Sequence, residues 1–189
     1  MNDPQQTARE HLGPDEHLYW AGTSDPAKLF TGRDGFLVPF SIFWCGFAVF
    51  WTVTATVSGA PFFFPLFGSV LVLLGLHLVF GRFIVKRHRK RTIVYAVTDR
   101  RALTITPRST REIPVGRTDR AVTWTGGRRH CSVEWGSSDG GGRPFMFGGV
   151  STKMYANTGL DGFFGPQPMA FWDVTDGEEL VRELDRVSR

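Results

Sequence analysis

The sequence predicts a membrane α-helical hairpin followed by a mainly β domain, a barrel of about seven strands capped by a C-terminal α-helix. Two apolar runs, Phe36–Val57 and Phe62–Val85, predict the hairpin. At about 1.5 Å per residue, each run is long enough to cross a hydrocarbon core of about 30 Å. Beyond the basic residues that follow the second run, apolar residues alternate with polar ones as in strands. We therefore expect three regions: a cytoplasmic N-terminal segment with room for a strand (1–35), the hairpin with a basic collar (36–91), and the β domain (92–189).

Charge predicts the orientation of the hairpin. The connector Ser58–Pro61 carries no charged residue, whereas the second run is followed at once by the basic sequence Lys86–Arg91. Basic residues remain on the cytoplasmic side of a membrane. We therefore expect two spans in the cytoplasmic membrane, with both termini in the cytoplasm. The first thirty residues hold no apolar signal segment, so the hairpin itself is expected to direct insertion.

The basic collar at the end of the second run has two interpretations. It comprises Arg82, Lys86, Arg87, Arg89, Lys90 and Arg91. Such a cluster binds anionic lipid head groups at about 1 kcal/mol per basic residue. It also fixes the orientation of the membrane helices, which needs no selective lipid contact. Membrane lipids with anionic head groups are therefore an expected partner, and topology alone is the simpler interpretation.

Small residues form a helix-packing seam in each span. Those of the first span recur at alternating steps of four and three, and those of the second lie one heptad apart. They are Ser41, Cys45, Ala48, Thr52 and Ala55 in the first span and Gly68 and Gly75 in the second. Small residues allow two helices to approach closely. The short connector favours packing within the hairpin, and contact with a second protomer is the alternative.

His77 is the one ionisable residue well inside a predicted span. Ionisable groups within a membrane are functional hypotheses by default, for example as proton relays. A single histidine makes no relay, so we favour a neutral imidazole that is hydrogen-bonded to a hydroxyl or to the backbone. Transport by this chain alone is not expected.

Seven segments that follow the collar have the composition of short strands. In the first pair, Ile93, Tyr95 and Val97 are expected to share one face, opposite Leu103 and Ile105. The predicted strands are 92–98, 101–106, 111–115, 121–125, 131–135, 144–147 and 169–174. Thr175–Glu178 then has the spacing of a capping box and leads into apolar residues at helical spacing, which predicts the C-terminal helix.

These features together resemble the bacterial pleckstrin-homology-like membrane proteins. The resemblance rests on the hairpin, its basic exit, the sequence Val94–Leu103, the strands and the terminal helix. Leu18–Gly22 and Pro39–Ser41 are also similar to that group. It implies a seven-stranded barrel capped by a helix, used as an interaction module with variable partners.

The chain departs from the eukaryotic lipid-binding relatives at the connection that forms their head-group pocket. That pocket uses a long basic loop between the first two strands, whereas the sequence here indicates the tight turn Thr98–Arg101. We expect no head-group pocket at that place. The irregular stretch Gly148–Pro168 is the better candidate for a recognition loop, because long loops in compact domains are usually functional or disordered.

No catalytic signature is found, so the sequence predicts neither an enzyme nor a cofactor. Gly136–Gly140 matches the G-x-S-x-G nucleophile elbow, but no helix is expected after it. His130 and Cys131 are adjacent, and in a strand they point to opposite faces, which excludes a Cys-His dyad. The remaining histidines lack the spacing of metal ligands. The pI of 9.4 suggests nucleic acid, but the collar lies at the bilayer and no nucleic-acid motif is present.

The sequence therefore predicts a non-enzymatic membrane protein that presents a cytoplasmic domain for binding a protein partner or a second copy. The alternative function is sensing of anionic lipid head groups through the collar. A weaker alternative is a subunit of a membrane enzyme or transporter complex. No small-molecule substrate is indicated.

Overall fold

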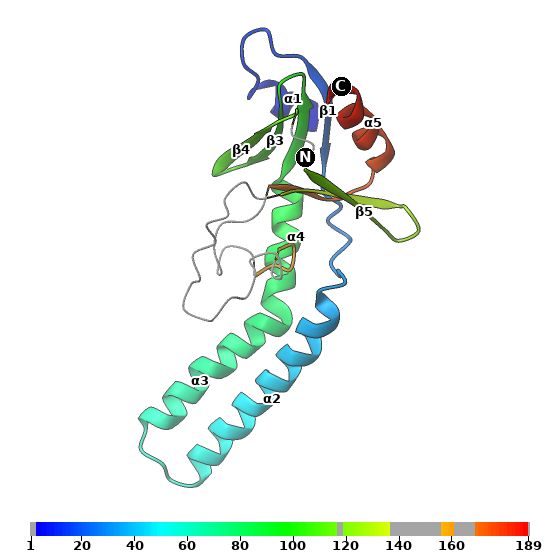
Figure 1. Cartoon of the computed structure of the whole chain (residues 1–189). Helices are drawn as coiled ribbons and strands as arrows, with labels where there is room; N and C mark the ends of the chain where they lie inside the picture. Colours follow the sequence, from blue (N-terminus) through cyan, green and yellow to red (C-terminus); the bar gives the residue numbers. More distant parts are fainter. Residues whose placement is uncertain (1–2, 117–118, 137–155, 161–168, 189) are drawn as a thin grey trace.

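A helical hairpin extends from one side of a β domain (Figure 1). The computed structural model describes residues 3–116, 119–136, 156–160 and 169–188. The hairpin consists of helix α2 (Asp34–Val57) and a second continuous helix, Phe63–Thr92. Both are long and apolar enough to cross a membrane, as predicted, and only 17% and 11% of their most apolar stretches are buried. A helix that is apolar on all sides and yet exposed fits a lipid environment.

The second helix continues through the basic collar. It consists of α3 (Phe63–Leu76), a π-helical turn η1 (His77–Gly81) and α4 (Arg82–Thr92). The apolar run was predicted to end at Val85, but the helix extends seven residues further. Helical geometry therefore sorts the collar residues onto different faces of α4.

Seven strands form two antiparallel sheets in the described part of the chain. One sheet has the order β1-β2-β3-β4 and the other β5-β6-β7, and a single bridge between Ser24 and Val174 connects them. The strands are β1 (Leu18–Thr23), β2 (Val94–Thr98), β3 (Arg101–Thr106), β4 (Ser109–Pro114), β5 (Arg120–Thr125), β6 (His130–Trp135) and β7 (Ala170–Val174). Six of them match the strands predicted after the collar, and β1 lies in the N-terminal segment that was expected to have room for a strand. The seventh predicted strand, 144–147, lies outside the described residues.

Strand β1 precedes the hairpin in sequence and belongs to the β domain. It pairs with β2 from Leu18 opposite Thr98 to Thr23 opposite Val94. The connection between the first two strands is therefore the whole hairpin, and the tight turn at Asp99 and Arg100 joins the second strand to the third. The prediction that this turn connects the first two strands was wrong, because β1 precedes β2 in the sheet.

The main core lies between the two sheets and the C-terminal helix α5 (Gly177–Val187). Its members are buried aromatic and aliphatic residues from both sheets and from α5. They are Trp20, Tyr95, Val97, Ala102, Ile113, Cys131, Val133, Trp135, Phe171, Val174, Leu180 and Leu184. Phe171 stacks on Tyr95 with ring centroids 4.6 Å apart. Aromatic and aliphatic burial of this kind is the principal stabilising contribution to a small domain.

A smaller apolar cluster lies on the other face of the first sheet. Val94 and Ala96 pack there with Leu103 and Ile105, under Ala8 of the short helix α1 (Pro4–Arg9). The prediction that Leu103 and Ile105 oppose Tyr95 and Val97 was wrong. The two-residue turn places Ala96 opposite Leu103 and Val97 opposite Ala102, and directly paired residues share a face. Both faces of β2 are consequently buried.

The C-terminal helix begins differently from the prediction. Asp176 occupies the N-cap position and makes no side-chain capping bond, so the predicted capping box is absent. Glu178 and Glu179 lie in the first turn and Arg186 in the last, an order that suits the helix dipole. Leu180 and Leu184 are fully buried and fix the helix on the core.

Candidate functional site

The basic residues of the collar divide into two faces of α4. Arg82, Lys86 and Lys90 recur every four residues and are buried, with exposed fractions of 0%, 2% and 4%. Arg87 and Arg91 are exposed, and Arg89 is half-buried. Burial of three cations requires compensating charges and hydrogen bonds, because an isolated buried charge is very costly. The structure supplies both from segments distant in sequence.

Asp34 compensates the first of these cations. Its Oδ1 lies 2.6 Å from Nη1 of Arg82, and its Oδ2 lies 3.9 Å from Nζ of Lys86. Oδ2 also accepts hydrogen bonds from the backbone and the hydroxyl of Thr31, at 2.7 and 2.8 Å. The carboxylate sits in the first turn of α2, where the helix dipole favours negative charge. This ion pair ties the two long helices together where they meet the β domain.

The two lysines bind the backbone that connects β1 to α2. Nζ of Lys86 donates to the carbonyl of Leu29 at 2.5 Å. Nζ of Lys90 donates to the carbonyls of Lys28 at 2.6 Å and Asp25 at 3.2 Å. These carbonyls belong to a segment outside the helices and strands, so the lysine side chains supply donors that water would otherwise provide.

Asp173 holds α4 to strand β7. Its carboxylate lies 2.6 Å from Nζ of Lys90 and 2.6 Å from Nζ of Lys28, and it accepts a hydrogen bond of 2.7 Å from Asn157. Burial alone would raise the pKa of this carboxyl, but the charge of Lys90 and the hydrogen bonds from Lys28, Lys90 and Asn157 outweigh it and hold the pKa below its usual range. Asp173 has a positive φ of 50°, a conformation that Asp and Asn tolerate better than most residues.

We call this set of residues the joint. It comprises Lys28, Asp34, Arg82, Lys86, Lys90 and Asp173. Removing one partner of a buried ion pair costs about 3–5 kcal/mol, whereas apolar residues of the same shape often serve stability equally well. We therefore expect the joint to contribute mainly a defined orientation of the β domain relative to the hairpin.

A segment far along the chain closes over the joint. Residues 156–160 are all buried, and the carbonyl of Ala156 accepts a hydrogen bond of 2.8 Å from Arg33. Gly159 has a φ of 86°, and a Cβ placed there would lie 2.1 Å from the carbonyl oxygen of Arg82. Only glycine permits this close approach to α4. The remainder of the predicted recognition loop, 148–155 and 161–168, lies outside the described residues.

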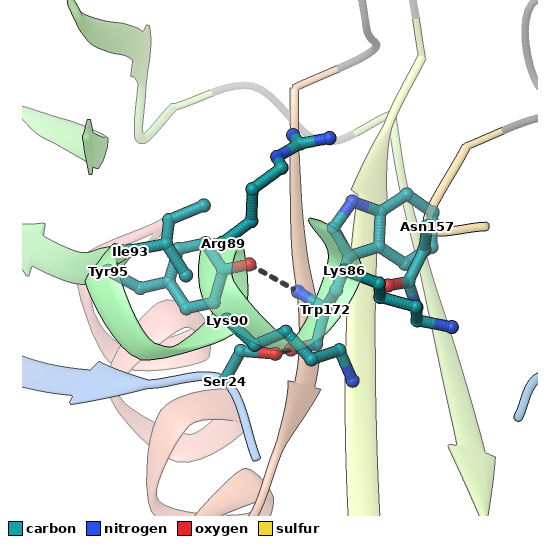
Figure 2. A pocket seen from close by; sticks show the side chains of 8 residues that line it. All are labelled: Ser24, Lys86, Arg89, Lys90, Ile93, Tyr95, Asn157 and Trp172. Carbon is teal, nitrogen blue, oxygen red and sulfur yellow. Dashed lines mark hydrogen bonds between the residues drawn. The ribbon is translucent and has the colours of Figure 1, made fainter. Parts of the chain in front are cut away.

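A small pocket lies beside the joint (Figure 2). Its volume is about 30 Å³, which is room for about two water molecules. The pocket is lined by Ser24, Lys86, Arg89, Lys90, Ile93, Tyr95, Asn157 and Trp172. The backbone N–H of Trp172 donates to the hydroxyl of Tyr95 at 3.1 Å, and burial raises the pKa of that hydroxyl well above its usual range. The pocket is too small for a substrate or a lipid head group.

The structure brings the predicted seam residues of the two helices together. A Cβ added to Gly68 would lie 2.3 Å from the hydroxyl of Thr52, and one added to Gly75 would lie 3.0 Å from Cα of Cys45. Ser41 and Ala48 are buried on the same side of α2, and Ala55 is half-buried. Contact of these seams within the hairpin leaves the opposite sides of both helices exposed.

His77 begins the π-helical turn. A Cβ added to Gly81 would lie 2.4 Å from Nδ1 of His77, so the imidazole occupies the space above that glycine. The wider turn brings the backbone N–H of Arg82 to the carbonyl of His77. His77 therefore occupies the irregular turn just before the first buried cation.

The described residues show no metal-binding cluster. No group of three His, Cys, Asp or Glu side chains among them is placed to hold a metal ion. Cys131 is buried in the core, and burial raises the pKa of its thiol to about 11, so the thiol stays protonated near neutral pH. Four of the five residues in the G-x-S-x-G match, 137–140, lie outside the described residues.

Sequence reasoning recognised Arg82, Lys86 and Lys90 of the joint and missed Lys28 and both carboxylates. The two acidic residues, Asp34 and Asp173, are separated by more than a hundred residues and lie in no recognisable motif. The sequence did contain a signal for the buried face of α4. Arg82, Lys86 and Lys90 recur every four residues, which places all three on one side of a helix. Comparisons with protein-family models, curated proteins and solved structures find no match to this chain.

Proposed function

We propose that this chain is a non-enzymatic integral membrane protein that presents a pleckstrin-homology-like domain for binding a protein partner or a second copy. The two spans cross the cytoplasmic membrane and both termini face the cytoplasm. The insertion of the hairpin between β1 and β2 carries the proposal, together with the joint that fixes the domain on it. A domain tethered at two points and held by buried ion pairs keeps a constant face toward the cytoplasm.

The strand order supports the domain type. The family resemblance implies seven strands and a terminal helix, and the described residues contain seven strands in two sheets followed by α5. The proposed barrel would close around the main core at the Ser24 and Val174 bridge.

Strand β5 is the proposed site of protein contact. It lies at the end of its sheet, and among the described strands it pairs only with β6. Ala121, Val122 and Thr123 are exposed along it. An exposed strand edge with unpaired backbone groups binds a further strand from a partner chain.

Photocrosslinking in native membranes tests the proposal. A benzoylphenylalanine at Val122 should give reproducible adducts with a partner or with a second copy. The same group at Arg182, exposed on α5, is the matched control and should give few. Absence of adducts at Val122, in a protein that purifies strictly as a monomer, would refute the partner-binding function. Release of the protein from membranes by alkaline extraction would refute the anchoring.

A further inference from the structure

The outward side of the second helix carries a continuous stripe that changes from apolar to basic. Phe80, Ile84, Arg87 and Arg91 follow one another at steps of four, three and four, which places them on one side of a helix. Phe80 and Ile84 are 65% and 71% exposed, and both arginines are exposed. We call these four residues the outer stripe. It faces away from the buried stripe of Arg82, Lys86 and Lys90.

The helix length places the outer stripe at the edge of the bilayer. From Phe63 to Arg82 the helix rises about 28 Å, close to the thickness of the hydrocarbon core. Phe80 and Ile84 then lie on either side of that edge. Arg87 lies about 7 Å beyond Arg82, at the depth of the lipid phosphates, and Arg91 about 13 Å beyond it. The change from apolar to basic side chains therefore coincides with the change from acyl chain to head group.

The two arginines are available for an external anion. Asp34 and Asp173 neutralise the buried side of α4, and neither reaches its outer side. Within the part of the chain that the structure describes, Arg87 and Arg91 form no ion pair. The guanidinium group presents a planar fork of donors that matches two oxygens of a phosphate.

We propose that the outer stripe binds a phospholipid with a negatively charged head group. The acyl chain packs along Phe80 and Ile84, the phosphate pairs with Arg87, and Arg91 contacts the outer part of the head group. This inference depends on the membrane insertion proposed above and is independent of any protein partner.

Lipid selectivity of the reconstituted full-length protein tests this site. The protein is placed in phosphatidylcholine nanodiscs with a trace of spin-labelled phosphatidylglycerol or spin-labelled phosphatidylcholine, and the immobilised fraction of each label is measured. The wild type should prefer phosphatidylglycerol. The double variant R87Q/R91Q should lose this preference by up to about fivefold per arginine at low salt. R87K/R91K should retain part of it, because the charge remains and the bidentate geometry is lost.

The double variant R182Q/R186Q is the matched control. It removes two exposed arginines from α5, at the end of the β domain away from the hairpin (Figure 1). The lipid preference should be unchanged in it. The proposed site would be overturned if the wild type showed no preference for phosphatidylglycerol. It would also be overturned if the preference survived in R87Q/R91Q, or if the control lost it equally. Protein that stays in the bilayer without lipid preference contradicts only this inference, whereas protein that leaves the bilayer contradicts the anchoring.

Discussion

The second long helix presents two faces that contain similar residue types in different surroundings. On the inner face, Gly68 and Gly75 pack against α2, and Arg82, Lys86 and Lys90 then enter the joint. On the outer face, exposed apolar residues precede the exposed Arg87 and Arg91. The difference teaches that a basic sequence at the end of an apolar helix is not one functional unit. Arg82, Lys86 and Lys90 serve the interior of the protein, whereas Arg87 and Arg91 are exposed and can serve the proposed membrane surface.

The largest effect on stability is expected when a buried carboxylate of the inner face is removed. Asp173→Asn retains a side chain that tolerates positive φ but leaves Lys90 and Lys28 without a counter-charge. We expect a loss of about 3–5 kcal/mol in the free energy of unfolding, measured by denaturant titration in detergent. Asp185→Asn removes an exposed carboxylate that pairs with Arg120, and it should cost less than about 1 kcal/mol. If the two variants lowered the free energy of unfolding equally, the joint would contribute no more to stability than an exposed ion pair does.

Acid should weaken the inner face and spare the outer one. The pKa of Asp173 is lowered in the folded protein, so its stabilisation is complete above the ordinary carboxyl pKa and is lost as the pH falls through the folded value. The melting temperature of the wild type should therefore fall as the pH drops below about 4, whereas D173N lacks this titrating carboxyl. Within this acidic range, the variant should show a smaller pH dependence than the wild type. A pH dependence identical in both would contradict the assignment.

A larger side chain in the helix seam tests the part of the inner face that packs against α2. Gly75→Leu places a large side chain where even a Cβ lies 3.0 Å from the backbone of Cys45. The helices must separate, and we expect a loss of about 1–3 kcal/mol in unfolding experiments. Gly46→Leu is the control, because nothing lies within 4 Å of a Cβ at that position. Equal stability of both variants would show that the hairpin does not depend on close approach at Gly75.

The smallest effect on stability is expected on the outer face. R87Q/R91Q changes exposed side chains that form no ion pair with the described residues, so the free energy of unfolding should change by less than about 0.5 kcal/mol. A loss as large as that of D173N would mean that these arginines are structural. The comparison between the two faces would then fail.

The sequence predicts the elements of the fold better than their connections. Local patterns are sufficient for the two apolar helices, for strands β2 to β7 and for α5, because each pattern depends on neighbouring residues. The pairing of β1 with β2 joins residues about eighty positions apart, and no local pattern specifies it. The same holds for the joint, since Asp34 and Asp173 reach α4 only through the tertiary fold. Glycine spacing did identify Gly68 and Gly75, because close helix contact requires small residues at regular intervals.

The place of β1 before the hairpin has a consequence for the synthesis of the protein. Leu18–Thr23 leaves the ribosome before either long helix, yet its pairing partner Val94–Thr98 follows only after both. At ordinary rates of translation, several seconds separate the two strands. During that time β1 has no sheet to join, and in the membrane arrangement proposed above the hairpin must enter the bilayer in the correct orientation to bring β2 to it. Completion of the β domain therefore reports successful membrane insertion, and a wrongly inserted chain would expose unpaired strands to chaperones and proteases.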